Sequence, residues 1–377
     1  MPMTVRPISA RDHLDLIAER GSASFLQCPS WGAVKSQWRS ESLGWFDATA
    51  TRPHAAGLVL YRRLPLLPRW LAYLPEGPLL DWEGLDEAGL VEALRALVAH
   101  LREQGAFAVR LGPPVPVRAW DAETVKAGLA DPDAHRLTDL PPTRTFPAGA
   151  RVAAALREVG FRPPPPGAGF SAGQPRFVFQ LPLAGRSDAD LLAGFNQLWR
   201  RNVRRAERAG VSVRLGEEAD LVAFHALYAE TAARDGFTGR PLSYFQRMWR
   251  AMVAEDPDRL RLYLAEHEGE LVAATTLVQV GTHAWYSYGA SSTARREVRG
   301  SNAVQWRMMR DARERGASVY DLRGISEVLD PEDHLVGLVQ FKVGTGGEAV
   351  ELLGEWELPL DRLLAAAVGG YLRRRGG

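Results

Sequence analysis

The order of predicted helices and strands in the second half of the chain constrains its fold more than any other feature. The pattern reads helix, helix, helix, three strands, helix and strand, over residues 188–209, 220–235, 243–254, 260–266, 270–280, 283–289, 302–315 and 319–322. Runs of strands set between helices are typical of α+β folds. We therefore predict an α+β unit in this half, with a mixed but mostly antiparallel sheet.

The first half shows a weaker version of the same order. Its predicted elements are a helix, two strands, a helix, a strand and a helix, over residues 30–38, 58–60, 70–74, 86–103, 107–111 and 151–160. A chain of 377 residues is too long for one ordinary core, so two similar α+β domains are predicted. The Pro-rich run 163–169 is interpreted as the linker between them, and the aperiodic segment 113–147 as a long surface excursion.

Charge and cysteine content exclude several classes of protein. The formal net charge is +1, so no global basic field attracts nucleic acid and any RNA contact must be local. The single Cys28 excludes an internal disulfide framework and a cysteine-based metal cluster. Residues 1–10 lack a signal-peptide pattern, and a cytoplasmic setting is expected. The apolar stretch Leu58–Leu80 predicts core strands, with peripheral contact to a membrane surface as the alternative.

Lysine is nearly absent from this chain. Lys35, Lys126 and Lys342 are the only lysines among 46 basic residues. Where Arg has replaced Lys almost everywhere, a retained Lys indicates a requirement for a compact, titratable ammonium. Lys342 lies between Phe341 and a Gly-Thr-Gly-Gly turn at 344–347, which would leave its ammonium free to point at a ligand. The alternative is a chance lysine at a solvated strand end.

A second basic feature is a predicted helix face of five arginines. They are Arg200, Arg201, Arg204, Arg205 and Arg208. Most charge runs on helices are simply solvated faces. The functional alternative is a surface that binds a phosphate backbone, since like charges four residues apart repel each other unless an anion offsets them.

Three further positions carry candidate chemistry. Arg240 and Tyr244 are one helical turn apart, a spacing suited to a phosphate and a sugar, or equally to a capped helix with a core tyrosine. Tyr288 lies on an aromatic strand, which is more often core than ligand site. The helix start at 299–302 only loosely matches the pyrophosphate loop of acyl-CoA-dependent N-acetyltransferases. A Gly-x-Ser-x-Gly elbow and a Gly-x-x-x-x-Gly-Lys loop are both missing, which argues against hydrolases and nucleotide hydrolysis.

Six short segments distributed over most of the chain occur together in a characteristic order. They are Phe25–Trp31 with Lys35, Arg201–Ala206, Arg234–Phe237, Tyr286–Ser292, Tyr320–Ile325 and Gly337–Lys342. In order and spacing they resemble the Fem peptidyltransferases (the FemABX family), tRNA-dependent aminoacyl ligases of peptidoglycan cross-bridges. The resemblance implies two N-acetyltransferase-like (GNAT) domains in tandem. The first would cover residues 1–170 plus about 354–377, on the precursor side, and the second 171–353, on the aminoacyl-tRNA side.

The resemblance also implies an activity and its partners. Family members transfer an amino acid from aminoacyl-tRNA to an amine of a muropeptide precursor, either UDP-MurNAc-pentapeptide or a lipid-linked form. A monomer is expected. The precursor-binding residues by position are Lys35 (at the diphosphate), Arg240, Tyr244 and Tyr288. The pair at the transfer centre and the tRNA end is Phe341 and Lys342, and the five arginines would bind the tRNA.

The chain departs from the family pattern at one catalytic position. Family members often carry Asp-Pro after the strand that ends at Leu111, whereas this chain has Gly112–Pro113. A carboxylate base is therefore missing there, and no replacement is evident nearby. The sequence also leaves no room for the long helical hairpin that some relatives insert, which points to the smaller members. An aminoacyl ester is already activated, so its aminolysis needs no ATP, metal or CoA, and no cofactor is expected.

Three other functions stay open on the sequence alone. The first keeps the chemistry but uses a secondary-metabolite peptide as acceptor. The second is an acyl-CoA-dependent N-acyltransferase. The third is a catalytically inactive RNA- or precursor-binding protein, an alternative that Gly112 favours.

Overall fold

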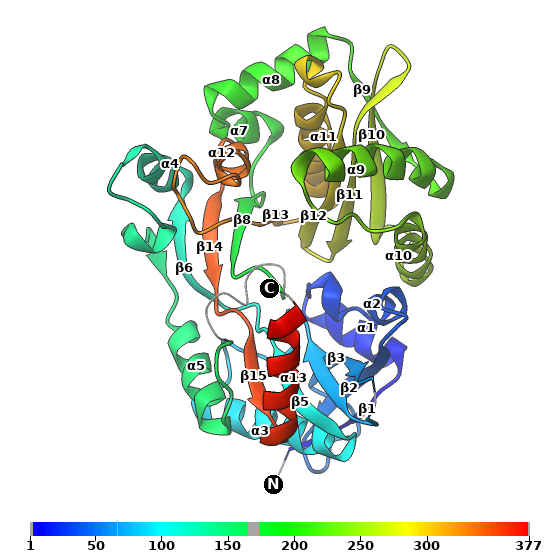
Figure 1. The fold of residues 1–377 in the computed structure, drawn as a ribbon, viewed down its shortest axis with the longest axis vertical. Helices are drawn as coiled ribbons and strands as arrows, with labels where there is room; N and C mark the ends of the chain where they lie inside the picture. Colours follow the sequence, from blue (N-terminus) through cyan, green and yellow to red (C-terminus); the bar gives the residue numbers. More distant parts are fainter. Residues whose placement is uncertain (1–2, 66, 165–172, 376–377) are drawn as a thin grey trace. The chain divides into compact units, whose positions relative to one another are not determined.

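The computed structural model describes residues 3–65, 67–164 and 173–375, and the chain divides into two compact units. The first unit comprises Met1–Arg118, Thr145–Arg176 and Glu351–Gly377. The second comprises Ala119–Arg144 and Phe177–Val350. Helices accompany a sheet with both parallel and antiparallel neighbours in each unit, so the predicted α+β class is confirmed (Figure 1).

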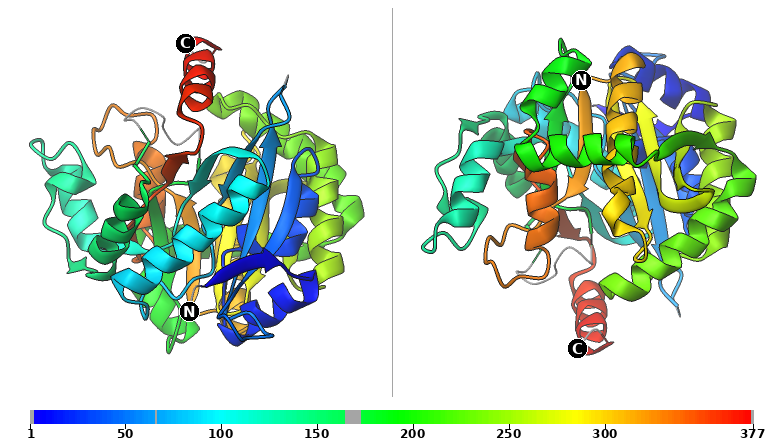
Figure 2. Two further views of the ribbon diagram at one scale, coloured as in Figure 1. Left: turned by 90° about the horizontal axis from the view of Figure 1, so that it is seen from below. Right: turned by 90° about the horizontal axis from the view of Figure 1, so that it is seen from above.

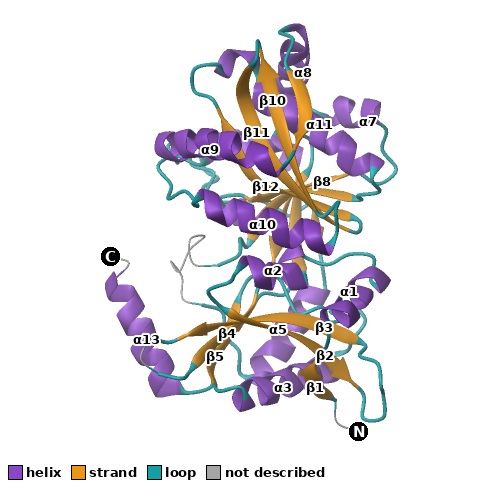
Figure 3. Ribbon diagram, turned by 90° about the vertical axis from the view of Figure 1, so that its right-hand side faces the viewer, coloured by secondary structure: helices purple, strands orange, loops and turns teal. Residues whose placement is uncertain are grey.

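The first unit is built on a six-stranded sheet of order β1-β2-β3-β4-β5-β15. Its strands are β1 Thr4–Pro7, β2 Arg39–Phe46, β3 Ala55–Arg63, β4 Trp70–Leu74, β5 Ala106–Leu111 and β15 Trp356–Pro359. Strands β4 and β5 are parallel neighbours, visible side by side in Figure 3, while β5 and β15 are antiparallel. The helices are α1 Ala10–Glu19, α2 Pro29–Val34, α3 Glu87–Glu103, α5 Ala148–Val159 and α13 Arg362–Arg375, the last drawn in red in Figure 2.

Helix α3 shows why this unit packs as predicted. The Asp86 side chain accepts a hydrogen bond from Gly89 N at 2.8 Å and so caps the helix start. The apolar stripe Leu90, Leu94, Leu97 and Leu101 is completely buried in the core. Within the stretch Leu58–Leu80, residues 58–61 of β3 and 74–80 are buried, as core strands require, whereas Arg62, Arg63 and Leu67 between them are exposed. Within the described ranges, no helix has both the length and the apolar character needed to cross a membrane.

The second unit is organised around a nine-stranded sheet of order β7-β6-β14-β8-β13-β12-β11-β10-β9. Its strands are β6 Pro116–Asp121, β7 Arg144–Thr145, β8 Phe177–Pro182, β9 Ser212–Gly216, β10 Leu260–His267, β11 Glu270–Val280, β12 His283–Ser291, β13 Val319–Gly324 and β14 Glu348–Leu352. Its helices are α4 Ala122–Ala130, α7 Asp188–Gly194, α8 Gln197–Arg208, α9 Leu221–Asp235, α10 Leu242–Glu255, α11 Gly300–Glu314 and α12 Val336–Val343. Short 3-10 turns cover Phe25–Gln27, Leu137–Asp139, Glu218–Asp220 and Arg296–Val298.

Two predicted helices end elsewhere than expected. The helix over 188–209 is interrupted after α7, because Phe195 is extended and the Asn196 side chain caps α8 by accepting from Trp199 N at 2.8 Å. The helix over 30–38 begins at Pro29 and stops at Val34 as α2, and no side-chain hydrogen bond caps its start. Proline at the first helical position needs no hydrogen-bond partner for its nitrogen.

The predicted domain boundaries need one correction. Residues 119–144 belong to the second unit and not to the first, because β6 and β7 lie at the edge of the nine-stranded sheet. The same segment contains α4 and two strands of the sheet, so the interpretation of 113–147 as a long surface excursion is wrong. A nine-residue helix and such short strands leave too little periodicity to detect in sequence. Most of the predicted linker 163–169 lies outside the described residues.

Candidate active site

Lys342 is buried inside the second unit. It lies on α12 rather than at a strand end, and only 3% of the residue is exposed. Its Nζ donates hydrogen bonds to the Gly324 carbonyl at 2.6 Å and to the Arg323 carbonyl at 3.4 Å. The expectation of an ammonium left free by the Gly-rich turn is therefore wrong, because the helix turns this side chain inward onto the end of β13.

The surroundings of Lys342 control its charge. Burial lowers the pKa of Lys342 from 10.5 to about 7, although the Asp321 carboxylate acts in the opposite direction. Asp321 is itself 3% exposed and accepts from Gln180 Nε2 at 3.0 Å and from the Arg323 backbone N–H at 2.5 Å. Burial opposes its ionisation, but His283 at 3.5 Å and these donors keep the pKa of Asp321 below its usual value. Lys342 is thus a lysine that titrates near neutral pH.

The backbone that Lys342 contacts is strained. Arg323 has a φ of +64°, a left-handed conformation that residues other than glycine rarely adopt. The pairing of β13 with β8 shifts register between Asp321 and Gly324, so the strand bulges at this point. The two hydrogen bonds from Lys342 hold the carbonyls of Arg323 and Gly324, at the C-terminal end of this bulge.

Helices α8 and α12 are joined next to Lys342. The Trp199 ring lies 4.8 Å from the Phe341 ring, and Trp199 Nε1 donates to the Phe341 carbonyl at 2.7 Å. Asn196 N donates to the Gly344 carbonyl at 2.9 Å. The helix with the predicted tRNA-binding arginines therefore packs directly on the helix with the predicted transfer-centre pair.

The basic face of α8 is smaller than predicted. Arg200 is half-buried, and its guanidinium donates to the carbonyls of Ala193 (3.1 Å) and Phe195. The other four arginines, at 201, 204, 205 and 208, are exposed, and no described residue forms an ion pair with them. The opposite face of the helix packs into the core through Trp199, Val203 and Ala206. A phosphate-binding surface on α8 would therefore have four arginines, not five.

Arg240, Tyr244 and Tyr288 come together as the resemblance implied. The Arg240 guanidinium lies 5.4 Å from the centre of the Tyr244 ring. The Tyr244 and Tyr288 hydroxyls are 3.0 Å apart. Burial, and next the neighbouring Tyr288, raises the pKa of Tyr244 well above its ordinary value, so it stays a neutral hydrogen-bonding hydroxyl. An exposed cation thus lies at the edge of two linked hydroxyls.

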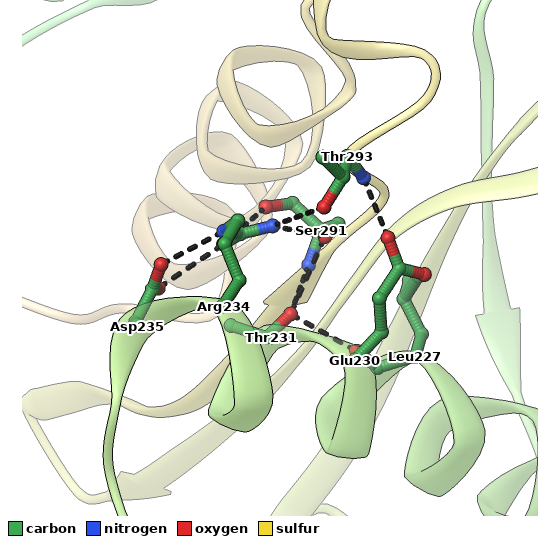
Figure 4. A network of polar contacts seen from close by, with 7 residues as sticks. All are labelled: Leu227, Glu230, Thr231, Arg234, Asp235, Ser291 and Thr293. Carbon is green, nitrogen blue, oxygen red and sulfur yellow. Dashed lines mark hydrogen bonds and ion pairs between the residues drawn. The ribbon is translucent and has the colours of Figure 1, made fainter.

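A polar network fixes the end of β12 beyond Tyr288 (Figure 4). Arg234 on α9 donates to the Ser291 carbonyl at 2.8 Å and forms an ion pair with Asp235 at 2.8 Å. The Thr231 hydroxyl accepts from Ser291 N at 3.0 Å, and the Glu230 carboxylate accepts from Thr293 N at 2.8 Å. Arg234, the first residue of the segment Arg234–Phe237, therefore holds the end of the Tyr288 strand on α9 together with Glu230 and Thr231.

Lys35 lies in the first unit, just after α2. Its Nζ is 4.9 Å from the centre of the Trp31 ring, and its carbonyl accepts from Trp38 N at 2.8 Å. The Trp38 ring in turn lies 6.2 Å from the Tyr73 ring on β4. Lys35 is half-buried, with its ammonium stacked on an aromatic ring.

A carboxylate stands beside Gly112, contrary to the sequence-based expectation that no replacement lies nearby. A Cβ placed on Gly112 would lie 3.3 Å from Glu355 Cγ. Glu355 is separated from Gly112 by more than 240 residues and is brought there by the pairing of β15 with β5. Only the register of that long-range strand pair reveals it, and the sequence offers no local signal.

Two α+β units with mixed sheets in one chain form the architecture of tandem N-acetyltransferase-like proteins. The FemAB family model matches residues 8–267 and 252–370. The chain belongs to the FemAB family, and it is a tRNA-dependent aminoacyltransferase of the kind that serves peptidoglycan bridge formation.

The similar proteins span nearly the whole chain. The lipid II:glycine glycyltransferase of Staphylococcus epidermidis is 23% identical and covers 95% of this chain and 93% of its own length. That of Staphylococcus aureus is 24% identical with the same coverage. Among solved structures, the crystal structure of FemX has a TM-score of 0.79 at 21% identity and covers 97% of this chain and 99% of its own. A tandem GNAT protein of the clavulanic acid pathway reaches 0.50 at 14% identity, with coverage of 94% and 98%.

Proposed function

We propose that this chain transfers an amino acid from aminoacyl-tRNA to an amine of a peptidoglycan precursor, in UDP-linked or lipid-linked form. The packing contact between α8 and α12 is the observation that supports the proposal. A face of four exposed arginines, suited to a phosphate backbone, lies on α8, and Trp199 on the buried side of that helix packs against Phe341, the neighbour of Lys342. A bound tRNA would thereby have its acceptor end near a buried, titratable lysine.

The chemistry fits these groups. The amine attacks the ester carbonyl, and negative charge develops on the carbonyl oxygen before the ribose oxygen leaves. Lys342 either meets this charge or holds the terminal tRNA phosphate, from a position fixed by the carbonyls at the end of β13. The precursor would bind through Lys35 at its diphosphate and through the cluster of Arg240, Tyr244 and Tyr288.

A mixed-donor assay tests the function. The purified chain is given tRNA charged with one labelled amino acid at a time, with UDP-MurNAc-pentapeptide or lipid II as acceptor, in the cytoplasmic pH range. The proposal expects label in an amide on one acceptor class. A parallel reaction contains acetyl-CoA and no tRNA. Acylation of the acceptor in that reaction, without transfer from any charged tRNA, would contradict the proposal.

Replacing Lys35 with Ala should raise the KM for the precursor about tenfold or more, since a hydrogen bond to a charged group contributes about 1.5–3 kcal/mol. The kcat should change little, because Lys35 is assigned to binding and not to the reacting atoms. Lys126→Ala is the control, as Lys126 is an exposed lysine of α4. A loss confined to kcat would show that Lys35 is misassigned.

Arg240→Gln should likewise raise the KM for the precursor, while the KM for aminoacyl-tRNA stays the same. The guanidinium is exposed beside the linked hydroxyls and is the only permanent charge of that cluster. Arg250→Gln, an exposed position on α10 paired with Glu218, is the matched control. Equal KM values in the two variants would remove Arg240 from the precursor site.

A further inference from the structure

Glu355 occupies the position that a side chain at residue 112 would otherwise fill. Strands β5 and β15 pair antiparallel with Trp356 opposite Leu111, so the next position in this register sets Glu355 opposite Gly112. Gly112 N donates to the Leu74 carbonyl at 3.3 Å, which places this point where the parallel strands β4 and β5 end. The missing carboxylate at 112 is thus compensated from across the sheet, within the first unit.

The first unit is built closely around this carboxylate. Its side chain is 9% exposed. Oε1 accepts from the Tyr73 hydroxyl at 2.5 Å and from Gln174 N at 3.1 Å. A Cβ on Gly173 would lie 2.0 Å from Oε2, so only glycine fits at that position while the carboxylate is there. Both described hydrogen bonds end on Oε1, which leaves Oε2 as the oxygen with capacity to accept a proton.

Glu355 is not simply half of a structural ion pair. Arg110 Nε donates to Glu357 at 2.7 Å, whereas the Arg110 guanidinium is 3.7 Å from Glu355 Oε2. Burial raises the pKa of Glu355, and the nearby Glu357 adds to this, while Tyr73, Gln174 and Arg110 oppose it. Buried carboxyls without a dedicated counter-ion are typical of general bases and acids.

The same cluster reaches the predicted precursor contact. Tyr73 donates to Glu355 and lies 6.2 Å, ring to ring, from Trp38. Trp38 N in turn donates to the Lys35 carbonyl at 2.8 Å. The residue assigned to the precursor's diphosphate and this buried carboxylate are therefore connected within one unit by a backbone hydrogen bond and one contact between aromatic rings.

We propose that Glu355 is the proton acceptor for the attacking amine, an inference that rests on the proposed function. The amine nitrogen forms a bond to the ester carbonyl carbon, and one of its protons passes to Glu355 Oε2. The bond between that carbon and the ribose oxygen then breaks, and the proton is returned to the leaving ribose oxygen. The products are an amide and a free ribose hydroxyl, and the carboxylate is regenerated.

Glu355→Gln tests the proposal, with Glu158→Gln, at an exposed glutamate of the first unit that pairs with Arg95, as the control. The Gln variant keeps the shape and an oxygen for Tyr73 and Gln174 but loses the base, so kcat should fall at least about 100-fold while both KM values stay within about threefold. The control should keep its kcat. A wild-type kcat in Glu355→Gln, while the wild-type chain transfers normally, would overturn this inference alone. A wild-type chain without any transfer would overturn the proposed function and this inference with it.

A second measurement does not depend on the folding of that variant. The kcat of the wild type should fall as pH decreases through the pKa of Glu355, which is raised above 4.5. Tyr73→Phe removes a hydrogen bond that stabilises the ionised carboxylate, so this acid limb should move to higher pH. A limb that stays at the same pH in Tyr73→Phe, or a wild-type profile with no acid limb, would contradict the assignment.

Discussion

Replacing Lys342 with Met is expected to lower aminoacyl transfer at least about 100-fold, since one preorganised donor or cation at a developing oxyanion contributes roughly 3–4 kcal/mol. Met keeps an unbranched apolar side chain only one atom shorter than that of Lys but leaves the Gly324 and Arg323 carbonyls without their donor. Single-turnover rates with saturating substrates measure the effect. Lys126→Met, at an exposed site on α4, should transfer at the wild-type rate. An unchanged rate in Lys342→Met would remove this residue from the mechanism.

The pH dependence of stability separates catalytic loss from misfolding. In the folded chain the pKa of Lys342 is about 7, against an ordinary value of 10.5. Between these pH values the unfolded chain binds one more proton, so this residue should make the free energy of unfolding rise as pH increases. Chemical denaturation from pH 7 to 10 should show that rise in the wild type and a smaller one in Lys342→Met. Identical slopes would mean that Lys342 is not buried as described.

Removal of the basic face of α8 has the second largest expected effect. A variant carries Arg201→Gln, Arg204→Gln, Arg205→Gln and Arg208→Gln. Each phosphate contact contributes about 0.7–0.9 to the slope of log affinity against log salt, so the slope should fall by about 3 and tRNA affinity by tenfold or more at 0.15 M salt. Filter binding at several salt concentrations measures both quantities. The KM for the precursor should not change.

A control variant with the same net charge shows whether the tRNA is attracted by the α8 surface or by the total charge of the protein. Four exposed arginines of the first unit are replaced together, as Arg11→Gln, Arg63→Gln, Arg69→Gln and Arg102→Gln. This variant has the same net charge as the α8 variant but keeps the α8 face. Its salt slope should match that of the wild type. Equal losses in the two variants would mean that total charge, and not α8, attracts the tRNA.

The elements that the sequence predicted well are those that local periodicity determines. Residues 86–103 form α3 because an Asp cap and a four-leucine stripe are both local signals. The break between α7 and α8 was missed, since it depends on Asn196 reaching both Trp199 N and the Gly344 carbonyl, which is remote in sequence. Because helix-forming residues continue on both sides of this break, the sequence reads as one long helix.

Some residues of the candidate site were also predicted correctly from the sequence, and others were not. Arg240, Tyr244 and Tyr288 are brought together as the family resemblance implied, although the contact between Tyr244 on α10 and Tyr288 on β12 is a tertiary one that local patterns do not predict. The direction of Lys342 was predicted wrongly, since a helix was not recognised at 336–343. Glu355 was not predicted, because its place beside Gly112 depends on the register between two strands that are far apart in the sequence.

The central claim is that the acyl donor is the ester of aminoacyl-tRNA and the product is an amide on the precursor. A rapid-quench single turnover with labelled aminoacyl-tRNA and the precursor tests it most directly, because mild alkali hydrolyses an ester and leaves an amide intact. The proposal predicts that label leaves the tRNA and appears, alkali-stable, on the precursor at one rate. Label that stays on the tRNA, or is released only as free amino acid, would contradict it.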